Sequence, residues 1–199
     1  LQNRPDLLEK NKLLSTDVHF LRKQQRFKLG RFLYVILVHY PVLNSLGKIS
    51  AVSLTNLDIH DIARVCCSYA LGGYYITTPL KDQQLLARRL LDHWLQGPGK
   101  EANPDRTQAV QKVFLRDDLD QVLADIALIC GQQPYVLATS AQETGGIVPE
   151  SVRSVLDQRP VALLFGTGHG LAPEILENAD AALRSIRCLD TYNHLSVRT

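Results

Sequence analysis

Two kinds of apolar segment alternate along this chain from about residue 30 onward. One kind is a nearly continuous run of aliphatic, β-branched and aromatic side chains, and it occurs at residues 32–39, 74–78, 112–116, 135–139 and 161–165. Such runs predict strands that are covered on both faces. The other kind has the spacing of an amphipathic helix, and it occurs at residues 59–71, 81–95, 119–129, 149–156 and 173–178. The alternation predicts an α/β domain with a mostly parallel sheet and helices on both faces.

Local signals at the segment ends predict where individual elements begin. Asn56 or Asp58 is available as the N-cap of the helix at 59–71. A last short strand is expected near residues 184–188, and Tyr192 marks the expected start of a final helix.

Residues 1–29 are polar and lack a strand pattern, and we interpret them as a basic arm or linker ahead of a domain at residues 30–199. The spacing of their apolar side chains predicts two short helical turns, the second capped by Ser15 or Thr16. Residues 1–31 carry eight lysines and arginines against three acids, whereas the whole chain has a net charge of only +2. Such an arm can contact phosphates, although a solvated helix surface explains the composition equally well.

Composition limits the class of protein. Hydrophobic residues make up 45% and charged residues 21% of the 199, which is typical of a globular domain. The sequence has no apolar run of about 18 residues and no secretion signal at its start, so neither a membrane span nor export is expected. Four cysteines without a Cys-x-x-Cys spacing favour reduced thiols in the cytoplasm over a disulfide framework or a zinc site. The absence of methionine predicts that the chain is a piece of a longer protein.

A glycine-rich loop, Gly166-Thr167-Gly168-His169-Gly170, connects the buried strand at 161–165 to a helix starting at Pro173. Glycines allow positive φ angles and let backbone amides approach a ligand, and parallel sheets bind ligands at such junctions; the alternative is a tight turn without a ligand. The loop lacks the G-x-G-x-x-G spacing of dinucleotide-binding folds, the Gly-Lys-Ser/Thr of a phosphate-binding loop and the G-x-S-x-G of hydrolases. We therefore expect main-chain amide and carbonyl groups to hold an adenosine.

Polar side chains gather at three further positions where elements are expected to meet, namely residues 55–64, 139–140 and 191–198. Asp58 and Asp61 stand three residues apart at a helix start, which is typical of capping. Since no further His or Cys lies at ligand spacing, a metal site is not expected.

These blocks, taken in order, resemble the motifs of the SPOUT superfamily of RNA methyltransferases. Residues 56–64 resemble its first motif, N-x-G-x-x-x-R, residues 164–171 its second, F-G-x-E-x-x-G-L, and residues 192–197 its third, the entry to a last helix. The similarity is greatest to a bacterial family of S-adenosylmethionine-dependent RNA methyltransferases, over residues 30–199. Two positions depart from the motifs: Asp58 replaces the glycine of the first, and the glutamate of the second is absent.

The resemblance implies a deep C-terminal trefoil knot, a homodimer, and S-adenosylmethionine (SAM) bound in the knot loops. Arg64 matches the arginine of the first motif, and we expect Arg64 and Asn193 to act on the side of the methyl acceptor, although Arg64 taken alone fits a solvated surface equally well. His169 or His194 would accept the acceptor's proton, unless they are structural histidines. The cofactor contacts that the resemblance implies are Thr139, Ser140, Phe165, Gly166, Thr167, Gly168, His169, Gly170, Ile186, Leu189, Tyr192 and Leu195.

The arm has a resemblance of its own. Its residues Arg4-Pro5-Asp6-Leu7-Leu8-Glu9 are similar to the extreme C-terminus of bacterial tRNA (guanine-N1-)-methyltransferases. This similarity implies that the chain is the downstream part of a fusion, and it favours SAM-dependent methylation of tRNA, with the arm and Arg187 or Arg198 at RNA phosphates. The alternatives that remain are a non-catalytic dimerising module that binds SAM or RNA, and a dinucleotide-dependent oxidoreductase.

Overall fold

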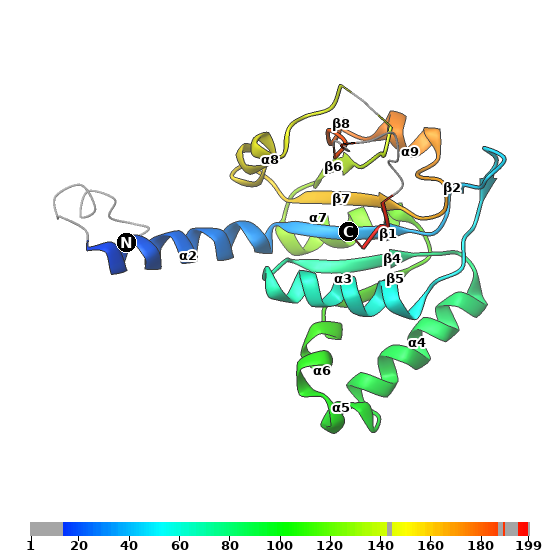
Figure 1. The fold of residues 1–199 in the computed structure, drawn as a ribbon, viewed down its shortest axis with the longest axis horizontal. Helices are drawn as coiled ribbons and strands as arrows, with labels where there is room; N and C mark the ends of the chain where they lie inside the picture. Colours follow the sequence, from blue (N-terminus) through cyan, green and yellow to red (C-terminus); the bar gives the residue numbers. More distant parts are fainter. Residues whose placement is uncertain (1–13, 143–144, 187–188, 190–194, 199) are drawn as a thin grey trace.

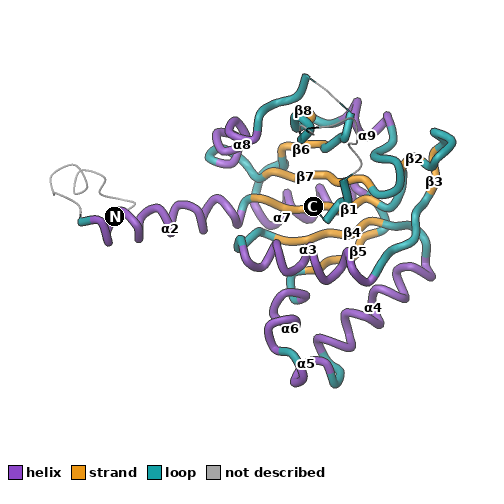
Figure 2. The backbone as a smooth tube through the Cα atoms, viewed as in Figure 1, coloured by secondary structure: helices purple, strands orange, loops and turns teal. Residues whose placement is uncertain are grey.

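The central sheet has six strands, which lie in the order β5 (Val113–Arg116), β4 (Gly73–Thr77), β1 (Leu33–Val38), β7 (Val161–Gly166), β6 (Tyr135–Ala138) and β8 (Ala181–Ala182). Every neighbouring pair in this sheet is parallel. The computed structural model describes residues 14–142, 145–186, 189 and 195–198. Figure 2 shows the strands side by side, with helices around them. The predicted α/β architecture on a parallel sheet is confirmed.

The helices connect these strands, and most of them lie where the apolar spacing predicted them. The helices at 81–95, 149–156 and 173–178 have the predicted bounds. The described helices are α2 (Ser15–Arg31), α3 (Asn56–Ser68), α4 (Lys81–Leu95), α5 (Gly99–Ala102), α6 (Pro104–Val110), α7 (Leu119–Cys130), α8 (Pro149–Leu156) and α9 (Pro173–Asn178).

Both faces of the sheet are covered because alternate residues of a strand point to opposite sides. Val35 and Leu37 of β1 pack into a hydrophobic cluster to which α3, α4 and α6 contribute. The alternate residues of β1, Ile36 and Val38, pack into a second cluster with side chains of α7 and α9. Figure 1 shows α3 on one side of the sheet and α7 on the other. The continuous apolar run at 32–39 therefore reflects burial on two faces.

Two pairs of short elements were not predicted from the sequence. One is an antiparallel hairpin of β2 (Val42–Leu43) and β3 (Ile49–Ser50), whose strands are too short to show an alternating pattern. The other is the pair α5 and α6, which follows Gly97-Pro98. The start of α6 does carry a signal, since the Asn103 side chain accepts from the Arg106 amide at 3.0 Å, with proline in the first turn.

The N-cap of α3 differs from the two residues that the sequence predicted. Thr55 occupies that position, and its side chain accepts a hydrogen bond from the Asp58 amide. Asn56 and Asp58, the predicted candidates, lie inside the helix. The helix also ends at Ser68, before the predicted 71, because the chain then turns with Ala70 at a positive φ of 53°.

The helix in the basic arm also differs from its prediction. The second predicted turn is one continuous helix, α2, and Leu14 takes the N-cap position that was expected for Ser15 or Thr16. The first predicted turn lies outside the described residues. Asp17 accepts from the Leu14 amide at 3.0 Å. Figure 1 shows α2 projecting away from the sheet. Residue 30, the predicted domain boundary, lies within the last turn of this helix.

The C-terminal elements differ from their predicted positions. The last strand of the sheet is Ala181–Ala182, so the strand expected at 184–188 lies earlier in the chain. The helix expected from Tyr192 begins outside the described residues, and residues 195–198 are not helical. The knot depends on the same region and stays a prediction. Within the described ranges, no helix is long and apolar enough to cross a membrane.

Candidate functional site

A cavity of about 710 Å³ lies at the carboxyl ends of β6 and β7, the edge at which parallel sheets bind ligands. Stretches far apart in the sequence line it: the residues after β6, the glycine-rich loop after β7, and residues 183–186 and 195–197 near the C-terminus. The remaining walls come from the hairpin region, the start of α3 and α9, and include Leu43, Val52, Ser53, Thr55, Asp58 and Leu176.

This cavity gathers ten of the twelve positions that the motif resemblance assigned to a cofactor: Thr139, Ser140, Phe165, Gly166, Thr167, Gly168, His169, Gly170, Ile186 and Leu195. Leu189 is not brought to it, and its side chain is fully exposed. Tyr192 and the expected acceptor-side Asn193 lie outside the described residues.

The glycines of the loop are required by its geometry. A Cβ on Gly166 would lie 2.5 Å from the Leu171 amide nitrogen, a distance that real Cβ atoms do not adopt. Gly168 and Gly170 have φ angles of +62° and +107°, in the region that disfavours other residues. These constraints fold residues 166–171 back on themselves, and they form one wall of the cavity.

Three amides of this loop donate hydrogen bonds within the chain. Thr167 donates to the Val38 carbonyl at 3.2 Å, His169 to the Leu43 carbonyl at 2.9 Å, and Gly170 to the Thr167 carbonyl at 3.1 Å. The Thr167 and His169 N–H groups therefore hold the loop against β1 and the hairpin, and the Gly170 N–H group closes a turn within the loop, so these three amides already have partners in the chain. The glycines at 166, 168 and 170 allow the close packing of this wall.

Neutral polar groups and apolar side chains make up most of the wall. Thr139 Oγ1 donates to the Leu164 carbonyl at 2.8 Å, and Ser140 Oγ accepts from the Gln142 amide at 3.1 Å. The Thr139 oxygen therefore retains acceptor capacity and the Ser140 hydroxyl retains its proton. In the described part of the lining, the acidic and basic side chains besides histidine are Asp58 and Arg184. Such a wall suits an aromatic ring with hydroxyl groups better than a polyphosphate.

Residues 32–199 match the family described as SAM-dependent RNA methyltransferases. The chain belongs to this family. Relatives and solved structures agree with the assignment. The chain is 54% identical over 198 residues to a tRNA (guanine-N(1)-)-methyltransferase of Nitratidesulfovibrio vulgaris, a match that covers 100% of this chain but 47% of that protein. It is 37% identical over 184 residues to an uncharacterized protein of Aquifex aeolicus, covering 91% of this chain and 87% of the relative.

Among solved structures, the chain is similar to the SpoU methyltransferase AviRb from Streptomyces viridochromogenes, crystallised in complex with the cofactor AdoMet. The TM-score is 0.52 at 14% sequence identity, and the match covers 85% of this chain and 53% of the other. At that identity the likeness shows a common fold. The SpoU-type α/β fold that the motif resemblance implied is thus confirmed.

Arg64 does not line the cavity. It is exposed on α3, one helical turn after His60, whose ring lies edge-on to Trp94 at a centroid distance of 5.6 Å. Arg106 stacks over the same tryptophan at 4.7 Å. Burial, followed by the charge of Arg106, lowers the pKa of His60. The first-motif arginine therefore belongs to a basic and aromatic surface of α3, α4 and α6 in the single chain.

Asp58 lines the cavity, although the sequence indicated only a capping role for it. Its carboxylate is buried, lines the cavity and accepts from Thr55 Oγ1 at 2.5 Å. Arg198 pairs with Asp58 and Asp61 within the chain, and its expected contact with RNA phosphates stays a prediction. Throughout the described ranges, no group of three His, Cys, Asp or Glu side chains is arranged to hold a metal ion.

His39 lies at the end of β1, fully buried behind the start of α3. Its Nδ1 is 3.2 Å from the Val52 carbonyl, while its Nε2 and the neighbouring Thr77 Oγ1 are buried without a partner among the described residues. Burial lowers the pKa of His39, and the nearby Asp58 charge opposes that effect. His39 is therefore a neutral structural side chain beneath the site.

Proposed function

We propose that the cavity binds SAM and that this domain transfers the methyl group to RNA, with tRNA as the favoured substrate. The observation that carries the proposal is the convergence of ten motif-derived cofactor positions on one cavity. Its volume of about 710 Å³ falls within the range of cofactor pockets, which is roughly 300–1,000 Å³. Arg184 provides a positive charge in the lining, which suits the carboxylate at the amino-acid end of SAM.

Methyl transfer from SAM requires the protein mainly to orient the methyl donor and the acceptor and to remove one proton from the acceptor. SAM supplies an activated methyl group when bound. Thr139 and Ser140 would orient the adenosine end, and His169, which lines the cavity, would accept the proton that the acceptor loses. Arg64 and Asn193 are proposed to hold the RNA acceptor. Because Arg64 lies outside the cavity, this role requires the RNA, or a second copy of the chain, to join the α3 surface to the cavity.

The wider protein is the second part of the proposal. The chain spans 47% of the length of the curated relative from Nitratidesulfovibrio vulgaris, whereas it matches 87% of the relative from Aquifex aeolicus. These shares support a separable domain at residues 30–199 that is fused, behind the arm at 1–29, to an upstream guanine-N1 methyltransferase. The proposal also includes a homodimer and a C-terminal trefoil knot, which the resemblance implies. It includes a cytoplasmic location as well.

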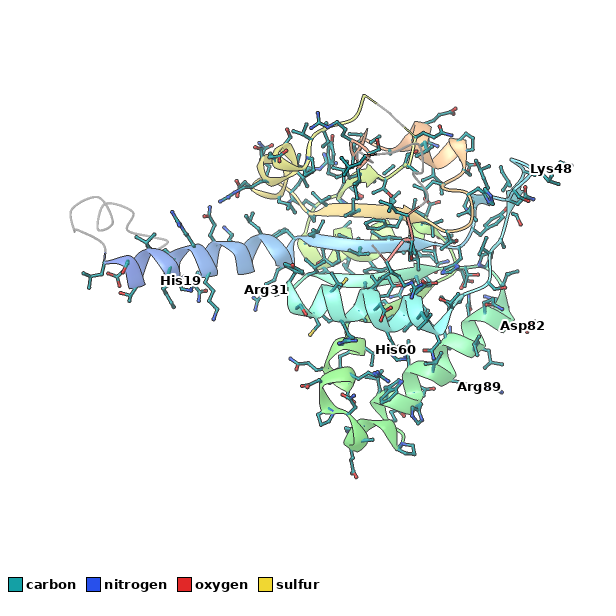
Figure 3. The ribbon with its side chains drawn as sticks, viewed as in Figure 1. His19, Arg31, Lys48, His60, Asp82 and Arg89 are labelled. Carbon is teal, nitrogen blue, oxygen red and sulfur yellow. The ribbon has the colours of Figure 1, made fainter. Side chains whose placement is uncertain are left out.

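Basic residues of the arm are proposed to contact RNA phosphates. Arg22, Lys23 and Lys28 are exposed on α2, which projects from the domain. In Figure 3, His19 is labelled in the N-terminal half of this helix and Arg31 at its end beside the sheet. A positive rod of this kind attracts a polyanion, because binding releases condensed counterions.

The test combines binding with transfer. Isothermal titration calorimetry of the 199-residue chain measures SAM binding without the second SAM site that a fused upstream methyltransferase would add. The same chain is then incubated with SAM carrying a labelled methyl group and with tRNA from a strain that lacks this domain. We expect micromolar binding and one new methylated nucleoside by mass spectrometry. The control is tRNA from the parent strain, which should accept little label because the site is already methylated. Absence of SAM binding refutes the cofactor site, and transfer to ribosomal RNA alone refutes tRNA as the substrate.

A further inference from the structure

The Arg198 side chain joins the C-terminal segment to α3 through two carboxylates. Its Nε lies 3.4 Å from Asp58 Oδ1, and its Nη1 lies 3.2 Å from Asp61 Oδ2. Asp58 and Asp61 are three residues apart and so share one side of the helix. The Thr55 hydroxyl holds the other oxygen of Asp58 at 2.5 Å, which fixes the carboxylate that faces Arg198.

The segment that Arg198 anchors is part of the cavity wall. Leu195, Ser196 and Val197 line the cavity, and Val197 also packs against the hydrophobic cluster of α3 and α4. Figure 1 shows the chain end, drawn in red, lying across the front of the sheet near α3. No regular secondary structure holds residues 195–198 in place. The ion pairs and the Val197 contact are therefore the described attachments of this wall.

Burial makes this ion pair stronger than an ordinary surface pair. The Asp58 side chain is 10% exposed and the Arg198 side chain 34% exposed, so solvent and salt screen their attraction less than on an open surface. One guanidinium also serves both carboxylates, so the second pair costs little additional side-chain entropy. The pair between Arg198 and Asp61 is the weaker of the two, because the Asp61 side chain is 44% exposed.

We infer that Arg198 is a positioning residue for cofactor binding, which holds Leu195–Val197 as the outer wall of the cavity by pairing with Asp58 and Asp61. The inference rests on the proposed SAM site. It accounts for the aspartate at position 58, where the first motif of the superfamily has glycine: the carboxylate has its partner in the C-terminal segment. Arg198 acts on the ligand through the wall, since it is not among the residues that line the cavity.

The first experiment needs no cofactor. Hydrogen–deuterium exchange of the full-length protein measures protection of the peptide that contains residues 195–198. We expect Arg198→Ala and Asp61→Ala each to speed exchange in that peptide several-fold, since each removes a pair that holds it. The matched controls are Arg89→Ala and Asp82→Ala, which alter exposed side chains of α4 (Figure 3). Unchanged exchange in Arg198→Ala overturns the anchoring role, whether or not SAM binds.

The second experiment measures SAM affinity by calorimetry across a double-mutant cycle. Asp61 is the clean partner to change, because it does not line the cavity. We expect Arg198→Ala to weaken binding about 10-fold and Asp61→Ala about 3-fold, with the double variant no weaker than Arg198→Ala alone. Arg198→Lys should lie between wild type and Arg198→Ala, because a lysine cannot span two carboxylates as a guanidinium does.

Three results contradict the inference: wild-type affinity in Arg198→Ala, a neutral Asp61→Ala, or effects that multiply in the double variant. Failure of the wild-type protein to bind SAM is a different result, which refutes the proposed cofactor site and leaves the exchange experiment to decide on the anchor. Circular dichroism of each variant checks that the sheet and helices are retained.

Discussion

Thr55 and Asp58 are joined by two hydrogen bonds at the start of α3. The Thr55 hydroxyl donates to the Asp58 carboxylate at 2.5 Å, and the same oxygen accepts from the Asp58 amide at 3.2 Å. The first bond orients a buried acid at the cavity, and the second satisfies an N–H group that the helix leaves open. One threonine thus couples the stability of α3 to the geometry of the site.

The first prediction concerns this cap. Thr55→Ala should lower the free energy of unfolding by about 1 kcal/mol, which is typical for loss of an N-cap side chain. Urea denaturation followed by circular dichroism measures the change, with the slope of the transition unchanged. Thr55→Ser is the matched control and should stay close to wild type, because it keeps the hydroxyl. Equal stability of the alanine and serine variants would mean that the cap contributes nothing.

The second prediction concerns the glycine-rich loop. Gly166→Ala places a Cβ 2.5 Å from the Leu171 nitrogen and 2.7 Å from the Gly170 carbon, so main chain has to move. We expect the affinity for SAM to fall at least 10-fold, because that main chain forms a wall of the cavity. Gly145→Ala is the control, since its Cβ meets nothing within 4 Å. Calorimetric affinities that are alike in the two variants would argue that SAM does not occupy this cavity.

The sequence predicted the elements whose signals are local. The apolar run at 32–39 and the glycines at 166–170 mark a buried strand and a folded loop through their own residues, and both lie where they were expected. β8 was placed too late in the chain, because Ala181–Ala182 has no β-branched pattern and is a strand only through its pairing with β6.

The errors at the site arise from partners that are distant in sequence. The main chain of the glycine-rich loop was expected to hold a ligand, and nothing local in the sequence indicated that the His169 amide donates to the Leu43 carbonyl, in a hairpin whose strands have two residues each. Asp58 had the spacing of a capping residue, and its partner Arg198 is far away at the other end of the chain. The bond between Arg198 and Asp61 spans 137 positions. Only tertiary structure brings these charges together.

The third prediction concerns pH and follows from His39. Burial lowers its pKa below the ordinary value of 6.5 in the folded protein, so the unfolded chain takes up a proton first as pH falls. The stabilising effect of the neutral form is complete above about pH 6.5, and it declines as pH falls from there toward the folded pKa. We therefore expect the free energy of unfolding, measured in urea, to be lower at pH 5.5 than at pH 7.5.

His39→Asn tests the assignment. The amide nitrogen of asparagine can take the place of Nδ1 opposite the Val52 carbonyl, but it does not titrate. The variant should be less stable than wild type at both pH values, with a smaller difference between them. His60, whose pKa is also lowered by burial, accounts for part of the dependence that remains, so His39→Asn with His60→Asn should be flatter still. A full wild-type difference in His39→Asn would exclude His39 as a source.

The last prediction concerns the basic arm and RNA. Arg22 and Lys23 are adjacent and exposed on α2, and Arg88 and Arg89 are a similar adjacent pair on α4. If α2 contacts phosphates, Arg22→Gln with Lys23→Gln should weaken tRNA binding and make the plot of log affinity against log salt shallower by about 2, roughly one for each lost contact. Filter binding between low and physiological salt gives both quantities. Arg88→Gln with Arg89→Gln removes the same charge from another helix and should change the slope much less. An equal loss of tRNA affinity in both double variants would indicate attraction to net charge alone. An unchanged affinity in the α2 variant would mean that α2 is a connector without a role in RNA binding.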